Sequence, residues 1–363
     1  MKKVFCILVI LALCMTAACK SPASDTNEVF NGEAIVIGFS QLGAESDWRS
    51  ANTDSMKATF TAANGFELIF EDGQQKLSNQ ITAIRTFIQQ EVDYIVLAPV
   101  MEKGWDTVLQ EAKAADIPVI IVDRMVDVED ESLFASWVGS NFELEGRKVT
   151  EWLHHYTEVN GISPADIHIV NIQGTLGASA QLGRSEALSD AAKLYGWDLL
   201  AEMTGDFTQA KGREVMEYLL TAYDNINVVY CENDHEALGA IEAIEAAGKT
   251  VGSDISNGEI MVLAFDGINE EAVEYLKEGK ITCIAECNPL HGPRVKAIID
   301  QLEAGRVPGK FNYVEEGFFS ADTTVTSLVI DGQVYGVTIV EKEEQEVAEP
   351  EIQNEEPEAV PQE

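Results

Sequence analysis

The fold is decided by two short apolar runs, Tyr94-Ile-Val-Leu-Ala98 and Pro118-Val-Ile-Ile-Val122, and by the helical segment from Trp105 to Ala115 between them. Runs that are apolar at every position are typical of strands covered on both faces, as in a parallel sheet. A helix between two such strands joins them by a right-handed crossover. The stretch therefore predicts a strand–helix–strand unit of an α/β fold.

The same pattern recurs between about residues 33 and 336. The further apolar runs are Ala34–Phe39, Phe66–Phe70, Ile167–Ile172, Val228–Cys231, Ile260–Phe265 and Ile281–Ala285. They fall into two groups that divide around Ser136–Ser140, and the chain is longer than one typical core requires. We therefore expect two doubly wound parallel sheets with a cleft between them.

The N-terminus has the features of an export signal. A short positively charged start precedes the apolar run Val4–Cys14, which is too short to span a bilayer, and Thr16-Ala-Ala-Cys19 follows. This order resembles a signal peptide (residues 1–18) with a lipoprotein cleavage site, so Cys19 is the expected site of lipid attachment. The alternative is an ordinary cleaved signal in which Cys19 has no role. Residues 19–32 are expected to form a lipidated, flexible tether.

The charge of the chain limits its partners. A formal net charge of −38 excludes nucleic acid as a partner, because phosphate binding needs a basic surface. Part of this charge is local, since residues 341–363 hold ten Glu, one Lys and no aromatic residue. Such a segment buries too little apolar area to offset its ordering entropy, so residues 339–363 are expected to be a disordered acidic tail.

Three cysteines remain beyond the expected signal and lipid site: Cys231, Cys283 and Cys287. Three is an odd number for an exported protein, and so few cysteines do not make a disulfide scaffold. Their spacing, without further Cys or His partners, is not a zinc pattern. We expect them to be small buried apolar residues, and we expect neither a metal nor a cofactor.

Ligands of open α/β sheets bind beyond the carboxyl ends of the strands, so the residues there are candidate ligand contacts. They are Ser40, Glu45, Trp48, Arg49, Asp123, Arg124, Arg184, Phe207, Asn233, Asp266 and Glu286. Each alone has a structural alternative: an Asp often caps a helix, and an Arg often forms a surface salt bridge. The whole set is typical of a site for a polyhydroxylated ligand. Carboxylates and guanidinium groups bind neighbouring hydroxyls, and an aromatic ring packs on the apolar face of a sugar.

Motifs for the common enzymatic chemistries do not accompany these residues. The turn Gly174-Thr-Leu-Gly177 lacks the Gly-Lys-Ser/Thr of a phosphate loop. The first strand is not followed by Gly-x-Gly-x-x-Gly, and the sequence has no Gly-x-Ser-x-Gly. A sugar-cleaving enzyme would need an acid–base carboxylate pair, whereas Arg neighbours are expected to keep these carboxylates ionised. The sequence therefore favours a binding protein over an enzyme.

Long motifs in this order resemble the periplasmic sugar-binding proteins of the ribose, galactose and LacI-like class, over residues 35–322. They are Gly38-Phe-Ser-Gln-Leu-Gly-Ala-Glu-Ser-Asp-Trp-Arg49, Leu97-Ala-Pro-Val100, Val122-Asp-Arg124, Gln173-Gly-Thr-Leu-Gly-Ala-Ser179 and Gly205-Asp-Phe-Thr208. Within the class the chain is most similar to galactofuranose-binding proteins of ABC importers. Pyranose and ribose binders commonly have a second aromatic residue close to Trp48, where this chain has Arg49.

The resemblance implies a fold of two Rossmann-like lobes joined by three hinge crossings, the type I periplasmic binding protein fold. The N-terminal lobe would comprise residues 33–137 and 288–318, and the C-terminal lobe residues 138–287 and 319–338. Glu286 would lie at a hinge strand and reach the ligand, at a position where the class often has Gln. The remaining contacts would face one another across the cleft, with Glu45, Trp48, Arg49, Asp123 and Arg124 on the first lobe and Arg184, Phe207, Asn233 and Asp266 on the second.

The resemblance also implies a function. The chain would be a monomer that captures a monosaccharide by hinge closure and delivers it to an ABC permease of the inner membrane. The lipid on Cys19 would hold it on the outer face of the cytoplasmic membrane, and a periplasmic location is the alternative. A second function remains open, because the same fold also serves sugar-sensing receptors that signal to a chemoreceptor or a histidine kinase.

Overall fold

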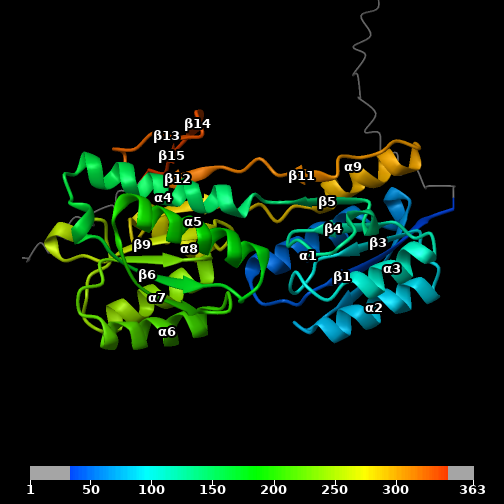
Figure 1. Cartoon of the computed structure of the whole chain (residues 1–363), viewed down its shortest axis with the longest axis horizontal. Helices are drawn as coiled ribbons and strands as arrows, with labels where there is room; N and C mark the ends of the chain where they lie inside the picture. Colours follow the sequence, from blue (N-terminus) through cyan, green and yellow to red (C-terminus); the bar gives the residue numbers. More distant parts are fainter. Residues whose placement is uncertain (1–32, 342–363) are drawn as a thin grey trace, which may run out of the picture.

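A computed structural model describes residues 33–341 of the chain, which form two lobes side by side (Figure 1). The N-terminal lobe has a parallel sheet in the order β11-β5-β4-β3-β1-β2. Its strands are β1 (Ile35–Gln41), β2 (Phe66–Asp72), β3 (Tyr94–Leu97), β4 (Val119–Val122), β5 (Ser136–Gly139) and β11 (Phe311–Tyr313). Its helices are α1 (Asp47–Thr59), α2 (Leu77–Gln89), α3 (Asp106–Ala114) and α9 (Gly292–Glu303).

Both faces of this sheet are covered. Ile95 and Leu97 of β3 pack in a core with α2 and α3, while Tyr94 and Val96 pack in a second core with α1 and α9. Every side chain of the strand is therefore buried, which is why every position of the run is apolar.

The C-terminal lobe repeats this construction with a sheet in the order β15-β12-β10-β9-β8-β6-β7. Helices α4 and α5 cover one face, and α6, α7 and α8 cover the other. The strands are β6 (His168–Gln173), β7 (Asp198–Thr204), β8 (Val228–Cys231), β9 (Met261–Asp266), β10 (Ile281–Glu286), β12 (Phe318–Ser320) and β15 (Thr338–Ile339). The helices are α4 (Phe142–Val159), α5 (Ser179–Tyr195), α6 (Gln209–Ala222), α7 (Asp234–Ala246) and α8 (Glu270–Glu278).

One strand pairing departs from the predicted parallel sheets. β12 runs antiparallel to β10, because the chain enters this lobe from the hinge rather than through a crossover helix. The hairpin of β13 (Ser327–Ile330) and β14 (Gln333–Gly336) follows and packs on α4. Single 3₁₀ turns complete the two lobes at η1 (Ala62–Asn64), η2 (Glu131–Leu133), η3 (Pro164–Asp166) and η4 (Ile255–Asn257).

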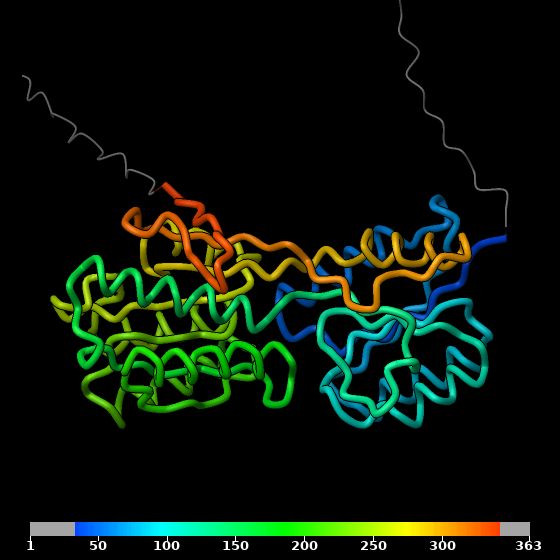
Figure 2. The backbone as a smooth tube through the Cα atoms, turned by 45° about the horizontal axis from the view of Figure 1, so that its top comes forward, coloured from blue at the N-terminus to red at the C-terminus, as the bar shows by residue number. Residues whose placement is uncertain are grey.

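The chain passes between the lobes three times (Figure 2). The first crossing, residues 140–141, joins β5 to α4; the second, residues 287–291, joins β10 to α9; the third, residues 314–317, joins β11 to β12. The predicted α/β fold with two lobes is confirmed. The lobe boundaries lie a few residues from those expected, because β5 extends to Gly139 and Phe318 already belongs to the second sheet.

The expected terminal segments lie largely outside the described residues. These are the signal peptide, Cys19 with its tether, and residues 342–363 of the acidic tail. The start of that expected tail is ordered structure, since Ile339 pairs through β15 with β12. Within residues 33–341, none of the helices combines the length and the hydropathy needed to cross a membrane.

Candidate ligand-binding cleft

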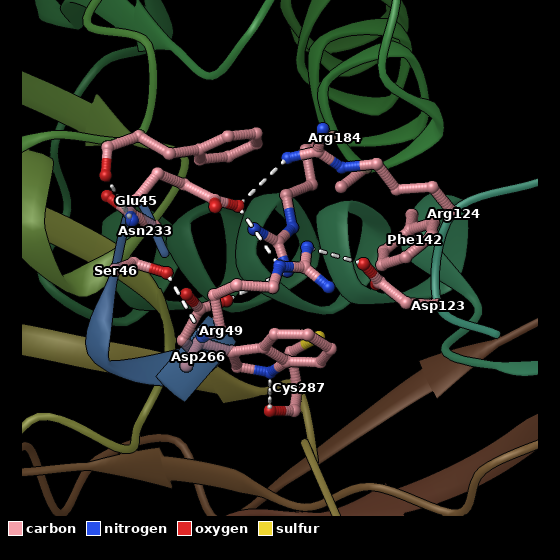
Figure 3. Close-up of a pocket in the computed structure, with 13 residues that line it drawn as sticks. Glu45, Ser46, Arg49, Asp123, Arg124, Phe142, Arg184, Asn233, Asp266 and Cys287 are labelled. Carbon is pink, nitrogen blue, oxygen red and sulfur yellow. Dashed lines mark hydrogen bonds and ion pairs between the residues drawn. The ribbon is translucent and has the colours of Figure 1, made fainter. Parts of the chain in front are cut away.

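A narrow pocket lies between the two lobes, at the carboxyl ends of their strands (Figure 3). Its empty volume is about 310 Å³, part of which is open to solvent. Residues of both lobes line the same pocket, so the two lobes lie close together here. The lining residues are Glu45, Ser46, Trp48, Arg49, Asp123 and Arg124 from the first lobe, Phe142, Ala180, Arg184, Phe207, Asn233 and Asp266 from the second, and Cys287 from the hinge.

Three lining residues have a left-handed backbone that is uncommon outside glycine. The φ angles are 63° at Asp123, 60° at Phe207 and 86° at Asp266. Neither Asp caps a helix, since the next helical caps along the chain are Asp130 and Asn269. The helix-cap alternative for these two carboxylates is thus excluded. Strained positions of this kind cluster at ligand sites, which supports a binding role.

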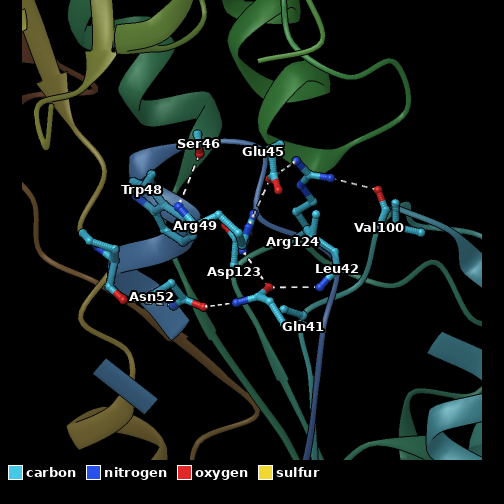
Figure 4. A network of polar contacts seen from close by, with 12 residues as sticks. Gln41, Leu42, Glu45, Ser46, Trp48, Arg49, Asn52, Val100, Asp123 and Arg124 are labelled. Atoms are coloured by element: carbon cyan, nitrogen blue, oxygen red, sulfur yellow. Dashed lines mark hydrogen bonds and ion pairs between the residues drawn. The ribbon is translucent and has the colours of Figure 1, made fainter. Parts of the chain in front are cut away.

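A buried guanidinium organises the first lobe's wall (Figure 4). Arg49 donates from Nε to Glu45 Oε1 at 3.1 Å and from its terminal nitrogens to Asp123 Oδ2 at 2.6 Å and Gln41 Oε1 at 3.4 Å. The spacing of four residues and the Ser46 cap at the start of α1 bring Glu45 and Arg49 together. With its donors engaged by this wall, Arg49 holds both carboxylates at fixed positions toward the cleft.

A second guanidinium organises the opposite wall. Arg184 of α5 donates to Glu145 Oε2 at 2.9 Å, to Asp266 Oδ1 at 3.1 Å and to the Glu232 carbonyl oxygen. Its Cζ also lies 4.6 Å from the ring centroid of Phe265. Charges taken out of water need partners of this quality, because an unpaired buried charge is strongly destabilising.

Aromatic side chains and a third guanidinium lie between these walls. Trp48 is 4 % exposed and donates from Nε1 to the Cys287 carbonyl oxygen at 2.6 Å, which joins α1 to the hinge. Arg124 donates to the Val100 carbonyl oxygen at 2.9 Å. Its Cζ lies 5.4 Å from the ring centroid of Phe207 on the other lobe. The cleft thus presents apolar ring surface beside charged groups, as the ring face and hydroxyls of a sugar require.

The pKa values of the two buried aspartates of the cleft, Asp123 and Asp266, shift in opposite directions. Burial alone would raise the pKa of Asp123, but Arg49 and Arg124 outweigh it and lower that pKa. Burial raises the pKa of Asp266 to about 8, and the charges of Asp234 and Glu145 add to this effect against Arg184. The Arg neighbours thus favour the ionised form of Asp123, whereas burial favours the protonated form of Asp266 in spite of Arg184. The reason is that burial at Asp266 exceeds the attraction of one shared guanidinium.

Glu45 is left with an unused acceptor. Its Oε1 accepts from Arg49 and lies 3.5 Å from the guanidinium of Arg124, whereas Oε2 is buried without a hydrogen-bond partner among the described residues. A buried oxygen in this state costs free energy unless a ligand donates to it. Unlike Glu45, Asn233 has partners for both polar atoms of its side chain. Its Oδ1 accepts from the Glu236 backbone at 2.8 Å and so caps α7, and its Nδ2 donates to the Phe207 carbonyl oxygen at 3.1 Å.

Two of the predicted site residues, Ser40 and Glu286, do not line the pocket. Ser40 is fully buried inside the first lobe, next to the Gln80 amide at 3.4 Å. Glu286 faces the hinge, where its Oε2 accepts from the Gly317 backbone at 2.7 Å and its Oε1 from the Asn288 amide at 3.1 Å. Both follow the sequence rule for strand ends, but their side chains turn away from the cleft.

Four lining residues were not predicted: Ser46, Phe142, Ala180 and Cys287. Ser46 lies inside the motif Gly38–Arg49, and Ala180 directly follows the motif that ends at Ser179. Phe142 follows the first hinge crossing, and Cys287 begins the second, so neither position could be recognised without knowing where the chain changes lobes. Cys231, Cys283 and Cys287 are buried free thiols, as expected of small apolar residues.

Contacts outside the pocket also join the lobes. On one side, Asn269 Nδ2 at the start of α8 donates to Asp47 Oδ2 of α1 at 2.5 Å, and His235 Nε2 lies 3.3 Å from the same carboxylate. On the other side, the Met125 backbone donates to Ser179 Oγ at 2.9 Å. The Asp47 contacts, which we call the α1–α8 latch, depend on the two lobes lying close together.

The two lobes, the three crossings and the cleft between them define a bilobed ligand-binding protein. The chain belongs to the periplasmic binding protein domain family, whose model matches residues 37–308.

The relatives of the chain are sugar-binding proteins. It is 38% identical over 299 residues to the galactofuranose-binding protein YtfQ of Escherichia coli, covering 81% of this chain and 90% of that protein. It is 27% identical over 335 residues to the fructose import binding protein FruE of Bifidobacterium longum, covering 89% and 95% of the two chains. Among solved structures, a Mycobacterium smegmatis protein in complex with β-D-fucofuranose is 38% identical with a TM-score of 0.73, covering 79% of this chain and 91% of that one. These relatives are binding proteins rather than enzymes, which confirms that prediction.

Proposed function

We propose that the chain captures a monosaccharide in its furanose form between the lobes and delivers it to an ABC permease. The observation that carries this proposal is the cleft itself, in which guanidinium groups, carboxylates and aromatic rings converge from both lobes. The unpartnered Glu45 Oε2 supplies an acceptor that a sugar hydroxyl would satisfy.

The preference for a furanose rests on the wall around Trp48. Its neighbour Arg49 is bound by Glu45 and Asp123, so this wall presents fixed polar groups where a second aromatic ring would present an apolar face. A rigid polar wall selects a sugar by the positions of its hydroxyls, because a ligand that leaves these groups unpaired is rejected. The furanose-binding relatives support this choice.

Capture follows from hinge motion. The sugar enters while the lobes are apart, and it stabilises the closed form only through its higher affinity for that form. The α1–α8 latch and the Met125–Ser179 contact add to closure without touching the pocket. The closed pair of lobes is then the surface that the permease would recognise.

The location forms part of the same proposal. The pattern of residues 1–19 supports export, cleavage before Cys19 and attachment of a lipid to that residue. The chain would then act as a monomer on the outer face of the cytoplasmic membrane. Mass spectrometry of the membrane fraction tests this, since a Cys19→Ala variant should lose both the lipid mass and the membrane association.

A thermal-shift and calorimetric panel tests ligand capture. D-galactose, D-fucose, L-arabinose, D-ribose and D-fructose are suitable, since each forms a furanose in solution, with methyl β-D-galactopyranoside as the ring-locked control. We expect one or more of the free sugars to raise the melting temperature by mass action, and the control to leave it unchanged. Binding of the pyranoside alone would contradict the furanose assignment, and binding of none would contradict sugar capture.

A further inference from the structure

A buried polar cluster lies where the three hinge crossings meet, beside the pocket. Glu145 of α4, Cys287 of the second crossing and Glu316 of the third each place one oxygen or sulfur atom within 4.8 Å of the others. Ser140 of the first crossing donates from Oγ to Glu316 Oε1 at 2.6 Å and lies 3.2 Å from Cys287 Sγ. We call these four residues the hinge cluster.

The hydrogen bonds of the hinge cluster leave one oxygen unexplained. Glu316 Oε1 accepts from Ser140 and from the Asn288 backbone at 2.7 Å, and Glu145 Oε2 accepts from Arg184. Glu145 Oε1 is buried without a donor among the described residues, although one side-chain oxygen of Glu145 and one of Glu316 lie within 4.8 Å of each other. Two ionised carboxylates cannot hydrogen-bond to each other, because both are acceptors only.

We propose that Glu316 is protonated in the folded protein at neutral pH and donates this proton to Glu145, so that one shared proton ties the hinge crossings to Arg184 of the cleft. The proton satisfies the unpartnered Glu145 oxygen and removes the repulsion between the buried carboxylate of Glu145 and the half-buried carboxylate of Glu316. It also leaves Glu145 ionised toward Arg184, which in turn holds Asp266.

The charges around the pair agree with this assignment. Lys148 of α4 donates from Nζ to the Glu316 carbonyl oxygen at 2.8 Å, and Arg184 of α5 faces Glu145; both favour ionised carboxylates. Asp266 of β9 and Glu286 of β10 also face this region and oppose ionisation. Burial is the largest effect and, with the charge of Glu145, raises the pKa of Glu316 to about 9.

The consequence is a hinge whose stability depends on pH. The pKa of Glu316 rises from an ordinary 4.5 to about 9 on folding, so the folded state binds the proton more tightly than the unfolded state. The resulting stabilisation is fully present below about pH 4.5 and declines until pH passes about 9. Above that pH, two negative charges would meet at the hinge and weaken the hold of Glu145 on Arg184.

Glu316→Gln is the informative variant, because its amide mimics the protonated acid and can donate to Glu145. The neighbouring exposed Glu315→Gln removes the same charge from the same crossing and is the matched control. Between pH 6 and pH 8, the folded wild type binds about one more proton than the unfolded chain. Its folding equilibrium constant should therefore fall about tenfold per pH unit relative to that of Glu316→Gln. The same comparison with Glu315→Gln should show no such divergence.

Infrared spectroscopy of the full chain detects a protonated carboxyl group directly, and the result does not depend on a difference in stability between variants. At pH 7 we expect a carbonyl band of protonated carboxyl groups, to which Asp266 also contributes; its intensity should fall by one group in Glu316→Gln and stay unchanged in Glu315→Gln. Parallel stability curves for wild type and Glu316→Gln, with an unchanged band, would overturn the proposal. So would stoichiometric Zn²⁺ binding that Cys287→Ser abolishes, because a cation would then occupy the place of the proton. Neither outcome bears on sugar capture, which the ligand panel tests separately.

Discussion

The α1–α8 latch makes a quantitative prediction, because it contributes to closure without contributing to the pocket. Asn269→Ser removes the amide that donates to Asp47, while a serine still serves as the N-cap that Asn269 provides to the Ala272 backbone. The variant should therefore keep α8 and the pocket intact and lose only the hydrogen bond between Asn269 and Asp47.

The expected loss of sugar affinity in Asn269→Ser depends on how exposed the Asp47 side chain is. A hydrogen bond to a charged group contributes about 1.5–3 kcal/mol when well protected. The Asp47 side chain is 56% exposed, so the contribution falls toward the value for surface pairs, about 1 kcal/mol at most. That free energy corresponds to a rise in Kd of about fivefold. Because the contact depends on the lobes lying close together, the change should appear in sugar dissociation rather than in association.

Stopped-flow tryptophan fluorescence measures both rates, since Trp48 lies in the cleft. Asp54→Asn, an exposed change on the same helix, is the control and should leave both rates unchanged. A dissociation rate for Asn269→Ser equal to that of the wild type, or a slower association in place of faster dissociation, would contradict a role of this contact in closure.

Further substitutions probe the pocket and its ionisation. Arg124→Ala and Asp266→Ala should each abolish measurable sugar binding in calorimetry, since truncating one partner of a buried charged contact costs about 2–5 kcal/mol. Circular dichroism should show both folds intact, and unchanged affinity in both would exclude these residues as ligand contacts. A Cβ at Gly174 would overlap the ring of Phe207, so Gly174→Ala should displace that ring and weaken binding at least about tenfold; wild-type affinity would mean that the ring does not contact the sugar. The raised pKa of Asp266, about 8, means that the free energy of unfolding declines as pH rises from about 4 to about 8, and denaturant titrations should find a smaller decline in Asp266→Asn.

The sequence predicted the parts of the fold that depend on periodicity. The apolar runs located the strands because burial on both faces leaves no polar position in β3 or β4. The antiparallel β12 could not be predicted, since the direction of a three-residue strand depends on the path of the third crossing. The alternation of side chains also explains Ser40, which lies at a strand end but points into the lobe.

The site was predictable where a motif and a strand end coincide, as at Asp123 and Asp266. It was not predictable at Phe142 and Cys287, which reach the pocket only because the chain changes lobes beside them. The raised pKa of Asp266 could not be predicted, because sequence reveals a charged neighbour but not the depth of burial.

On the proposed function, the cleft binds one monosaccharide in its furanose form. Carbon-13 NMR of the protein titrated with [1-¹³C]-D-galactose tests it directly, because the anomeric resonance distinguishes furanose from pyranose. We expect a bound furanose signal that saturates at one sugar per chain and is absent with Arg124→Ala. A bound pyranose signal, or a furanose signal that Arg124→Ala leaves unchanged, would contradict it.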